Sequence, residues 1–214
     1  MDSAAAQTRS PVGAERLAAL SDGVFAIALT LLVLDLSLPP GLDSAEFRAE
    51  LHRTLPNLGA YALSFAVIAQ YWRGHRQLLA ALPSLDERVT ALTLLGLALT
   101  ALLPFPTSLI AEYSAEPLAV AWYAGNVAAA TAVHLALLLI IHREGPLPGA
   151  APVRRLDVAD LALSFVVFLL SVPLAFVSPG GALLFWLLLI PLKVTIGHFQ
   201  RRAARPVPPD RGTP

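Results

Sequence analysis

The sequence has no cysteine, a single methionine, no excess of either charge and few charged residues of any kind. Without cysteine, the chain forms no disulfide and offers no thiolate for catalysis or metal binding. A net charge of zero provides no basic surface for nucleic acid, so we expect no nucleic-acid partner. Charged residues make up 14% of the chain and apolar residues 56%, whereas a soluble domain has about 25% charged residues. Too few polar side chains exist to cover a globule in water, and we expect an all-α integral membrane protein.

Motifs of the common enzyme classes are also missing. The chain contains no G-x-S-x-G, no H-E-x-x-H, no phosphate-binding loop and no dinucleotide-binding fingerprint. A hydrolase inside the membrane would need a nucleophile and a base at the same depth, and the sequence supports no such pair. We therefore predict that the protein is not an enzyme, needs no cofactor and has no metal site.

Long uncharged runs are the strongest positive signal. A membrane-spanning helix needs about 20 apolar residues, and residues 54–72, 89–111 and 117–141 meet this length without a formal charge. The uncharged run 161–192 is too long for one crossing, and the sequence Ser-Pro-Gly-Gly at 178–181 is typical of a turn. We divide this run into helices at residues 156–177 and 182–199. With a first span at residues 17–38, the sequence predicts six transmembrane helices.

The distribution of positive charge gives the orientation of these helices. If both termini are cytoplasmic, all but two of the fifteen Lys and Arg residues lie inside, and only Arg48 and Arg53 lie outside. This agrees with the positive-inside rule, whereas a five-helix chain would place the arginines after residue 200 outside. We expect a cytoplasmic segment at residues 1–16, a six-helix domain at 17–200 and a disordered cytoplasmic tail at 201–214. Residues 43–53 mix acids and bases and could form a short interfacial helix outside.

The first predicted helix is unusual because two aspartates bracket its apolar part. The uncharged residues between Asp22 and Asp35 make about 18 Å of helix, whereas the hydrocarbon core is about 30 Å thick. An acid at the centre of a span costs about 2.5–3.5 kcal/mol and normally points into a bundle or an aqueous path. We infer that this helix faces water or protein. Alternatively, Ser21 and Asp22 cap a helix that begins there, and Asp35 lies at the interface of a thinned membrane.

An apolar stripe follows the same helix. Ile27, Leu31, Leu34 and Leu38 recur at spacings that place them on one helical face, and Thr30 lies beside them. Such a stripe usually faces lipid or packs inside a bundle. Four copies around a symmetry axis would instead form stacked apolar rings, which can close a pore by dewetting.

Three segments in the first half of the chain carry recognisable motifs. Residues 16–22 read RLAALSD, residues 71–76 read YWRGHR, and residues 103–113 read LPFPTSLIAEY. In this order they resemble the transmembrane protein 175 family of potassium channels. That family has R-x-x-x-F-S-D at the start of its first helix, where this chain has Leu20 instead of phenylalanine. It has W-x-x-H-H at the end of the second helix, where Arg76 replaces the second histidine.

The resemblance implies a bacterial, single-repeat potassium channel in the plasma membrane. It implies a homotetramer of six-helix subunits in which the first helix lines a central pore, with potassium as the permeant ion. Ile27 would form the main constriction, Leu31 and Leu34 would lie outward of it, and the Thr30 hydroxyl would be a second ion-contacting group. The alternatives are a secondary transporter, which should show inverted repeats and helices broken at the midplane, and a non-conducting membrane scaffold.

The motif residues are better explained by a structural role than by ion binding. Arg16 and Asp22 are six residues apart, about 240° around a helix, and cannot pair on one face. At a comparable depth, the inner end of the second helix supplies three polar side chains: Trp72, His75 and Arg76. We expect Ser21 and Asp22 to bond to this group and hold the pore helix, with Arg76 neutralising Asp22. Alternatively, Arg76 faces the cytoplasmic headgroups.

A few polar residues lie outside this motif. Asp35, Glu112 and Glu116 would make the outer entrance acidic and concentrate cations there. His134 lies in the middle of the fourth predicted span without a second histidine or acid at ligand spacing. We interpret it as a buried, hydrogen-bonded histidine. The prolines within the spans, including Pro104, are expected to kink their helices.

Overall fold

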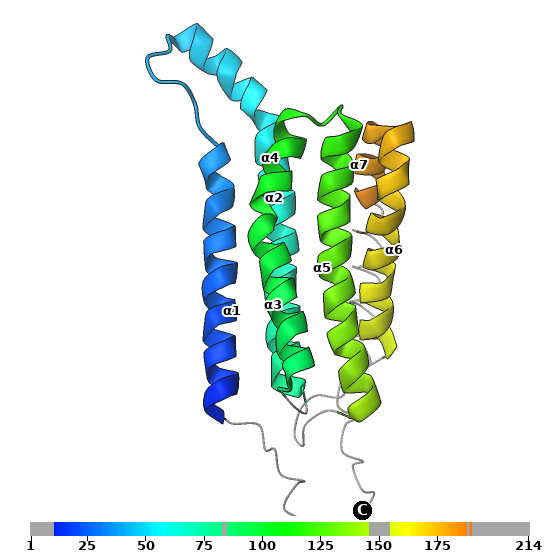
Figure 1. Cartoon of the computed structure of the whole chain (residues 1–214). Coiled ribbons are helices and arrows are strands. Elements are labelled where there is room, and N and C mark those ends of the chain that lie inside the picture. Colours follow the sequence, from blue (N-terminus) through cyan, green and yellow to red (C-terminus); the bar gives the residue numbers. More distant parts are fainter. Residues whose placement is uncertain (1–10, 83–84, 146–154, 188, 190–214) are drawn as a thin grey trace, which may run out of the picture.

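The chain folds into a bundle of roughly parallel helices that stand side by side (Figure 1). The computed structural model describes residues 11–82, 85–145, 155–187 and 189, and this part contains no β-strand. The elements are α1 (Pro11–Leu31), η1 (Leu32–Asp35), α2 (Ser44–Ala81), α3 (Glu87–Leu102), α4 (Pro104–Glu112), α5 (Pro117–Glu144), α6 (Arg155–Val177) and α7 (Pro179–Leu187). We call the end with the α1–α2 and α4–α5 connections the outer end, following the orientation predicted above.

Four helical segments of the described residues are long and apolar enough to cross a membrane. They are Gly13–Leu34, Glu87–Glu112, Pro117–Glu144 and Asp157–Val177. These correspond to the first, third, fourth and fifth predicted spans. The second predicted span lies within α2, whose 38 residues make about 57 Å of helix. Most of the sixth predicted span and the tail at 201–214 lie outside the described residues.

The beginning of α2 differs from the prediction. Residues 43–53 could have formed a short interfacial helix, but Ser44 and the residues after it belong to one helix that continues without a break into the second span. Asp43 caps this helix by accepting hydrogen bonds from the backbone N–H groups of Ala45 and Glu46, and Glu46 accepts one from the Asp43 N–H. Donation by the Glu46 and Ala45 amides lowers the pKa of the Asp43 carboxyl. Pro56 lies inside α2 and lacks the N–H that would bond one turn back, and α2 bends in this region (Figure 1).

The third predicted span is one crossing made of two helices. Helix α3 ends at Leu102 and α4 begins at Pro104, with the Leu103 N–H bonded to the Thr100 carbonyl. Because Pro104 has no N–H to donate, the helical ladder is interrupted there. The predicted proline break is therefore found at Pro104.

The turn predicted at residues 178–181 is shorter than expected. Only Ser178 separates α6 from α7, and α7 begins at Pro179 and not at residue 182. The Ser178 side chain accepts a hydrogen bond from the Gly181 N–H at 3.1 Å, so Ser178 caps α7. The glycines belong to the first turn of α7 and not to the connection, because proline at the first helical position already suits a helix start.

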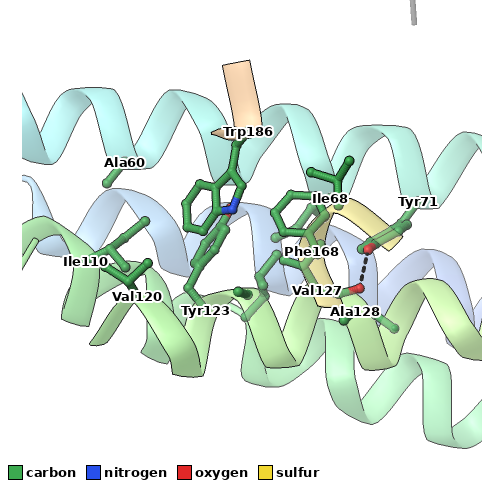
Figure 2. Packing of buried hydrophobic residues seen from close by; sticks show 14 of the residues in the cluster. Ala60, Ile68, Tyr71, Ile110, Val120, Tyr123, Val127, Ala128, Phe168 and Trp186 are labelled. Carbon is green, nitrogen blue, oxygen red and sulfur yellow. Dashed lines mark hydrogen bonds between the residues drawn. The ribbon is translucent and has the colours of Figure 1, made fainter. Parts of the chain in front are cut away.

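Helix α5 lies at the centre of the bundle and packs against α2, α3, α4, α6 and α7. Its many small residues allow close approach, and Gly96 of α3 lies where a Cβ atom would be 3.2 Å from a methyl group of Val133. Around Tyr123 of α5, Trp186 of α7 stacks at 5.0 Å and Phe168 of α6 lies beside Trp186 (Figure 2). The core is thus built on α5, whereas α1 lies at one edge of the bundle (Figure 1).

Candidate pore helix and its anchoring cluster

Helix α1 buries one face against its own subunit. The buried residues follow a helical spacing and contact α2 and α3. They are Leu17, Ser21, Phe25, Ala28 and Leu32. Of the four apolar spans, the segment from Gly13 to Leu34 has the smallest buried share. An edge helix with one buried face has a second face free for another partner.

The residues predicted to line a pore lie on the uncovered side of α1 and, for Leu34, in η1. Ile27 is 60% exposed, Leu31 40% and Leu34 68%. Thr30 is exposed beside them, and its hydroxyl donates to the Ile27 carbonyl at 2.9 Å. Because that bond uses the only hydroxyl proton, the Thr30 oxygen presents lone pairs outward. The residues that the structure describes leave this stripe largely uncovered.

Two hydrogen bonds join the inner half of α1 to α2. Trp72 Nε1 donates to the Asp22 carboxylate at 2.8 Å, and His75 Nε2 lies 3.0 Å from Ser21 Oγ. The Ser21 hydroxyl lies 2.8 Å from the Leu17 carbonyl and donates to it. Since the hydroxyl has one proton, Ser21 Oγ accepts from His75, which places the ring proton on Nε2. The structure thus brings together Ser21, Asp22, Trp72 and His75, which we call the anchoring cluster.

Contrary to our expectation, Arg76 does not pair with Asp22. Its guanidinium carbon lies 5.2 Å from the centre of the Trp72 ring, a cation–π geometry. In the part of the chain that the structure describes, Arg76 forms no ion pair with Asp22. The physical reason is that Arg76 follows Trp72 by one helical turn and lies over its indole, while the Asp22 carboxylate already accepts from the indole N–H.

Arg16, the first residue of the motif, is exposed at the inner end of α1. Its side chain forms no hydrogen bond or ion pair with the residues that the structure describes. The expectation that Arg16 and Asp22 do not pair agrees with this placement. Its role stays a prediction.

The anchoring cluster continues into the core through residues that the sequence analysis did not connect with it. Phe25 of α1 lies 5.5 Å from the His75 ring, and His134 of α5 lies 5.7 Å from it on another side. His134 also stacks on Tyr71 at 5.0 Å, and the Tyr71 hydroxyl oxygen lies 2.6 Å from the hydroxyl oxygen of Thr131. His134 is buried with Nδ1 at 2.9 Å from the Ala130 carbonyl, in agreement with a buried, hydrogen-bonded histidine.

The Tyr71 hydroxyl also donates to the Val127 carbonyl at 2.9 Å (Figure 2). This bond fixes Tyr71 of α2 against α5, and Tyr71 in turn supports His134 behind His75. Helix α1 is therefore connected through side-chain contacts to the central helix of the bundle. No spacing in the sequence could have found these partners, because they come from three different helices.

The acids predicted at the outer entrance lie at the outer end of the bundle. Glu112 is exposed at the last position of α4, and Glu116 is exposed before the first residue of α5. Asp35 ends η1, but its side chain lies outside the described residues. Among the described residues, no three His, Asp or Glu side chains are placed to hold a metal ion.

Comparison with known proteins gives the family. A profile described as "Endosomal/lysosomal potassium channel TMEM175" matches residues 16–104, from the start of the motif to the beginning of α4. A potassium channel of Streptomyces collinus is 36% identical over 170 residues, which cover 76% of this chain and 82% of that protein. The chain belongs to the TMEM175 family. Because the match covers 76% of this chain, it extends into α5, which the motifs in the first half did not reach.

Two further relatives extend the comparison. The crystal structure of a lysosomal potassium-selective channel TMEM175 homolog from Chamaesiphon minutus matches with a TM-score of 0.73 and 27% identity, covering 86% of this chain and 98% of that one. The human endosomal/lysosomal proton channel TMEM175 is 32% identical over 115 residues, half of this chain and 23% of that protein. The relatives are named as ion channels and not as enzymes. The TMEM175 resemblance seen in the sequence is confirmed.

Proposed function

We propose that this TMEM175-family chain is a potassium-permeable channel in a bacterial plasma membrane, which conducts passively through a pore lined by α1 from four subunits. Residues 17–200 form the channel domain, and residues 1–16 and 201–214 are its cytoplasmic segments. Potassium is the permeant ion, because a bacterial relative that matches over most of its length is named a potassium channel.

The observation that carries the proposal is the division of α1 into two faces. One face is buried and bonded to α2 through Ser21 and Asp22, so the helix is fixed in rotation within its subunit. The other face presents Ile27 at 60% exposure, although this helix lies at the edge of the bundle. A helix that is anchored so firmly presents the same face in every copy of the subunit.

A symmetric assembly turns this face into rings. Around a four-fold axis, Ile27 forms the narrowest ring, and Leu31 and Leu34 form further rings toward the outer end. Apolar rings of this kind gate by excluding water, and an ion passes only when the ring is wide enough to hydrate. The Thr30 oxygen lies beside the Ile27 ring and contacts the ion as it passes. Glu112, Glu116 and Asp35 concentrate cations at the outer entrance.

The test is planar-bilayer recording of the purified protein under a potassium/sodium gradient, with Ile27→Asn alongside. If Ile27 forms the constriction, asparagine wets it, and we expect a severalfold larger current or a reversal potential closer to zero. Leu170→Asn is the matched control, because Leu170 is 53% exposed on α6, on the far side of the bundle from α1. We expect its currents to equal those of the unaltered protein.

Other results would favour the alternatives. Substrate-coupled flux that saturates, without unitary currents, would indicate a transporter. Silent bilayers with both proteins would indicate a scaffold. A proton-selective reversal potential under a pH gradient would place this chain with its animal relatives, which are named proton channels.

A further inference from the structure

The outer arm of α2, residues 44–58, has an apolar stripe that its own subunit leaves half uncovered. Phe47 is 46% exposed, Leu51 46%, Leu55 52% and Leu58 49%. The spacing of these residues places them on one side of the helix. The charged side chains occupy the remaining circumference: Glu46, Arg48, Glu50 and Arg53. Arg53 and Glu50 pair on that side at 3.3 Å.

The position of the arm argues against acyl chains as the cover of this stripe. The beginning of α2, light blue in Figure 1, rises beyond the outer ends of α4, α5 and α6. Those ends mark the outer limit of the apolar spans, because Glu112 and Glu116 lie there. The stripe of the outer arm therefore begins outside the layer in which lipid tails could bury it. Leu55 and Leu58 already belong to the predicted span at residues 54–72, and the exposed apolar side continues along α2 to Phe65, which is 42% exposed.

The direction of the arm indicates what covers the stripe. The arm leans away from α5 and α6 and extends over the end of α1, the helix at the edge of the bundle (Figure 1). If α1 faces a shared axis, the arm projects toward the neighbouring subunit. An apolar stripe with a charged opposite face is the pattern of a helix that packs on one partner and exposes its other side to water.

We propose that the outer arm packs through Phe47, Leu51, Leu55 and Leu58 against a second copy of this chain, so that the arms of neighbouring subunits form an apolar collar outside the pore. This inference rests on the proposed assembly around α1. The collar holds the subunits together on the outer side of the pore rings. It also sets the opening through which cations enter.

The absence of cysteine allows a direct test in the full chain. Leu51→Cys introduces a single thiol on the stripe, and Ala49→Cys introduces one on the opposite, exposed side of the same turn. Each is labelled with a benzophenone maleimide in membranes and irradiated, because the photoproduct forms with whatever C–H bond lies nearest. We expect a covalent subunit dimer from Leu51→Cys and severalfold less from Ala49→Cys. Phe47→Cys repeats the test one turn earlier.

The mass of the detergent-solubilised assembly, measured by light scattering on the same samples, separates the two proposals. A four-subunit mass would leave the pore proposal intact. If such an assembly gave only lipid adducts, or equal dimer yields from Leu51→Cys and Ala49→Cys, the collar proposal would be overturned. A monomeric mass for the unaltered protein would overturn both proposals. Dimer formation confined to Leu51→Cys and Phe47→Cys in a four-subunit assembly supports the collar.

Discussion

At the inner end of α1, one hydroxyl group joins two helices. Ser21 and His75 are both 2% exposed, and Ser21 Oγ accepts from His75 Nε2 while donating to the Leu17 carbonyl. The neighbouring bond from Trp72 to Asp22 is more exposed to water. The buried bond should matter more for stability, because a buried donor that loses its acceptor cannot be satisfied by water.

We therefore predict that Ser21→Ala lowers the free energy of unfolding by about 1–3 kcal/mol, since it leaves the buried His75 N–H without its acceptor. The measurement is the unfolding midpoint of the detergent-solubilised protein, followed by tryptophan fluorescence. Ser108→Ala is the control, because the Ser108 hydroxyl bonds only to the carbonyl of Phe105 in its own helix. Equal midpoints for the two variants would contradict the role of Ser21 as an anchor.

The sequence predicted part of this cluster and missed the rest for a physical reason. The family motif placed Ser21, Asp22, Trp72 and His75 at one depth, and the structure brings them into contact. Arg76 contacts Trp72 of this group but does not form the expected pair with Asp22, because which side of the indole the next turn covers cannot be read from the sequence. The contacts of Phe25, Tyr71 and His134 with this cluster were not predicted, because contacts between helices depend on the rotation of each helix about its own axis.

At the scale of helices, α3 and α5 approach each other closely at a glycine, Gly96 of α3. A Cβ atom on Gly96 would lie 3.2 Å from a Val133 methyl group, whereas a Cβ on Gly59 of α2 would meet nothing within 4 Å. Both glycines are inside helices, so they share the same backbone cost. They differ only in what a larger side chain would displace.

We predict that Gly96→Leu destabilises the bundle by about 1–3 kcal/mol, because the added side chain overpacks a buried contact between two helices. Gly59→Leu should leave stability unchanged or raise it slightly, because leucine is the better helix former and has open space. Thermal unfolding midpoints of the two variants, compared with that of the unaltered protein, check this. A Gly96→Leu protein as stable as Gly59→Leu would show that α3 and α5 pack less tightly than described.

Uncharged runs predicted where the spans lie better than where the helices end. The runs identified the membrane-crossing parts of α1, α3, α5 and α6, since apolar length is the property that a bilayer selects. The outer part of α2 was read as a possible separate helix because it is charged. The sequence Asp43-Ser-Ala-Glu46 is a capping box and marks the true start of α2, a signal available in the sequence.

For the whole molecule, the sequence predicted a helical membrane bundle, and the fold agrees with it over the described residues. The assembly could not be derived in the same way. Pore, lipid and subunit contacts are all apolar, and the uncovered side of α1 has the same composition as a lipid-facing surface. Two observations favour a pore-facing side over a lipid-facing one. The opposite face of α1 is anchored to α2, and relatives of the chain are named potassium channels.

The orientation of the molecule in the membrane can be tested with the same cysteine-free background. In the topology predicted from the sequence, all but two of the Lys and Arg residues belong to cytoplasmic segments, which strongly favours that orientation. Ser114→Cys, in the exposed α4–α5 connection, should react with a membrane-impermeant maleimide in intact cells. Glu87→Cys, exposed in the first turn of α3 at the opposite end, should react only after the membrane is permeabilised. The reverse pattern would place Asp35 and Glu112 in the cytoplasm, so that the acidic entrance would concentrate cations on the inner side and the collar of α2 arms would lie inside the cell.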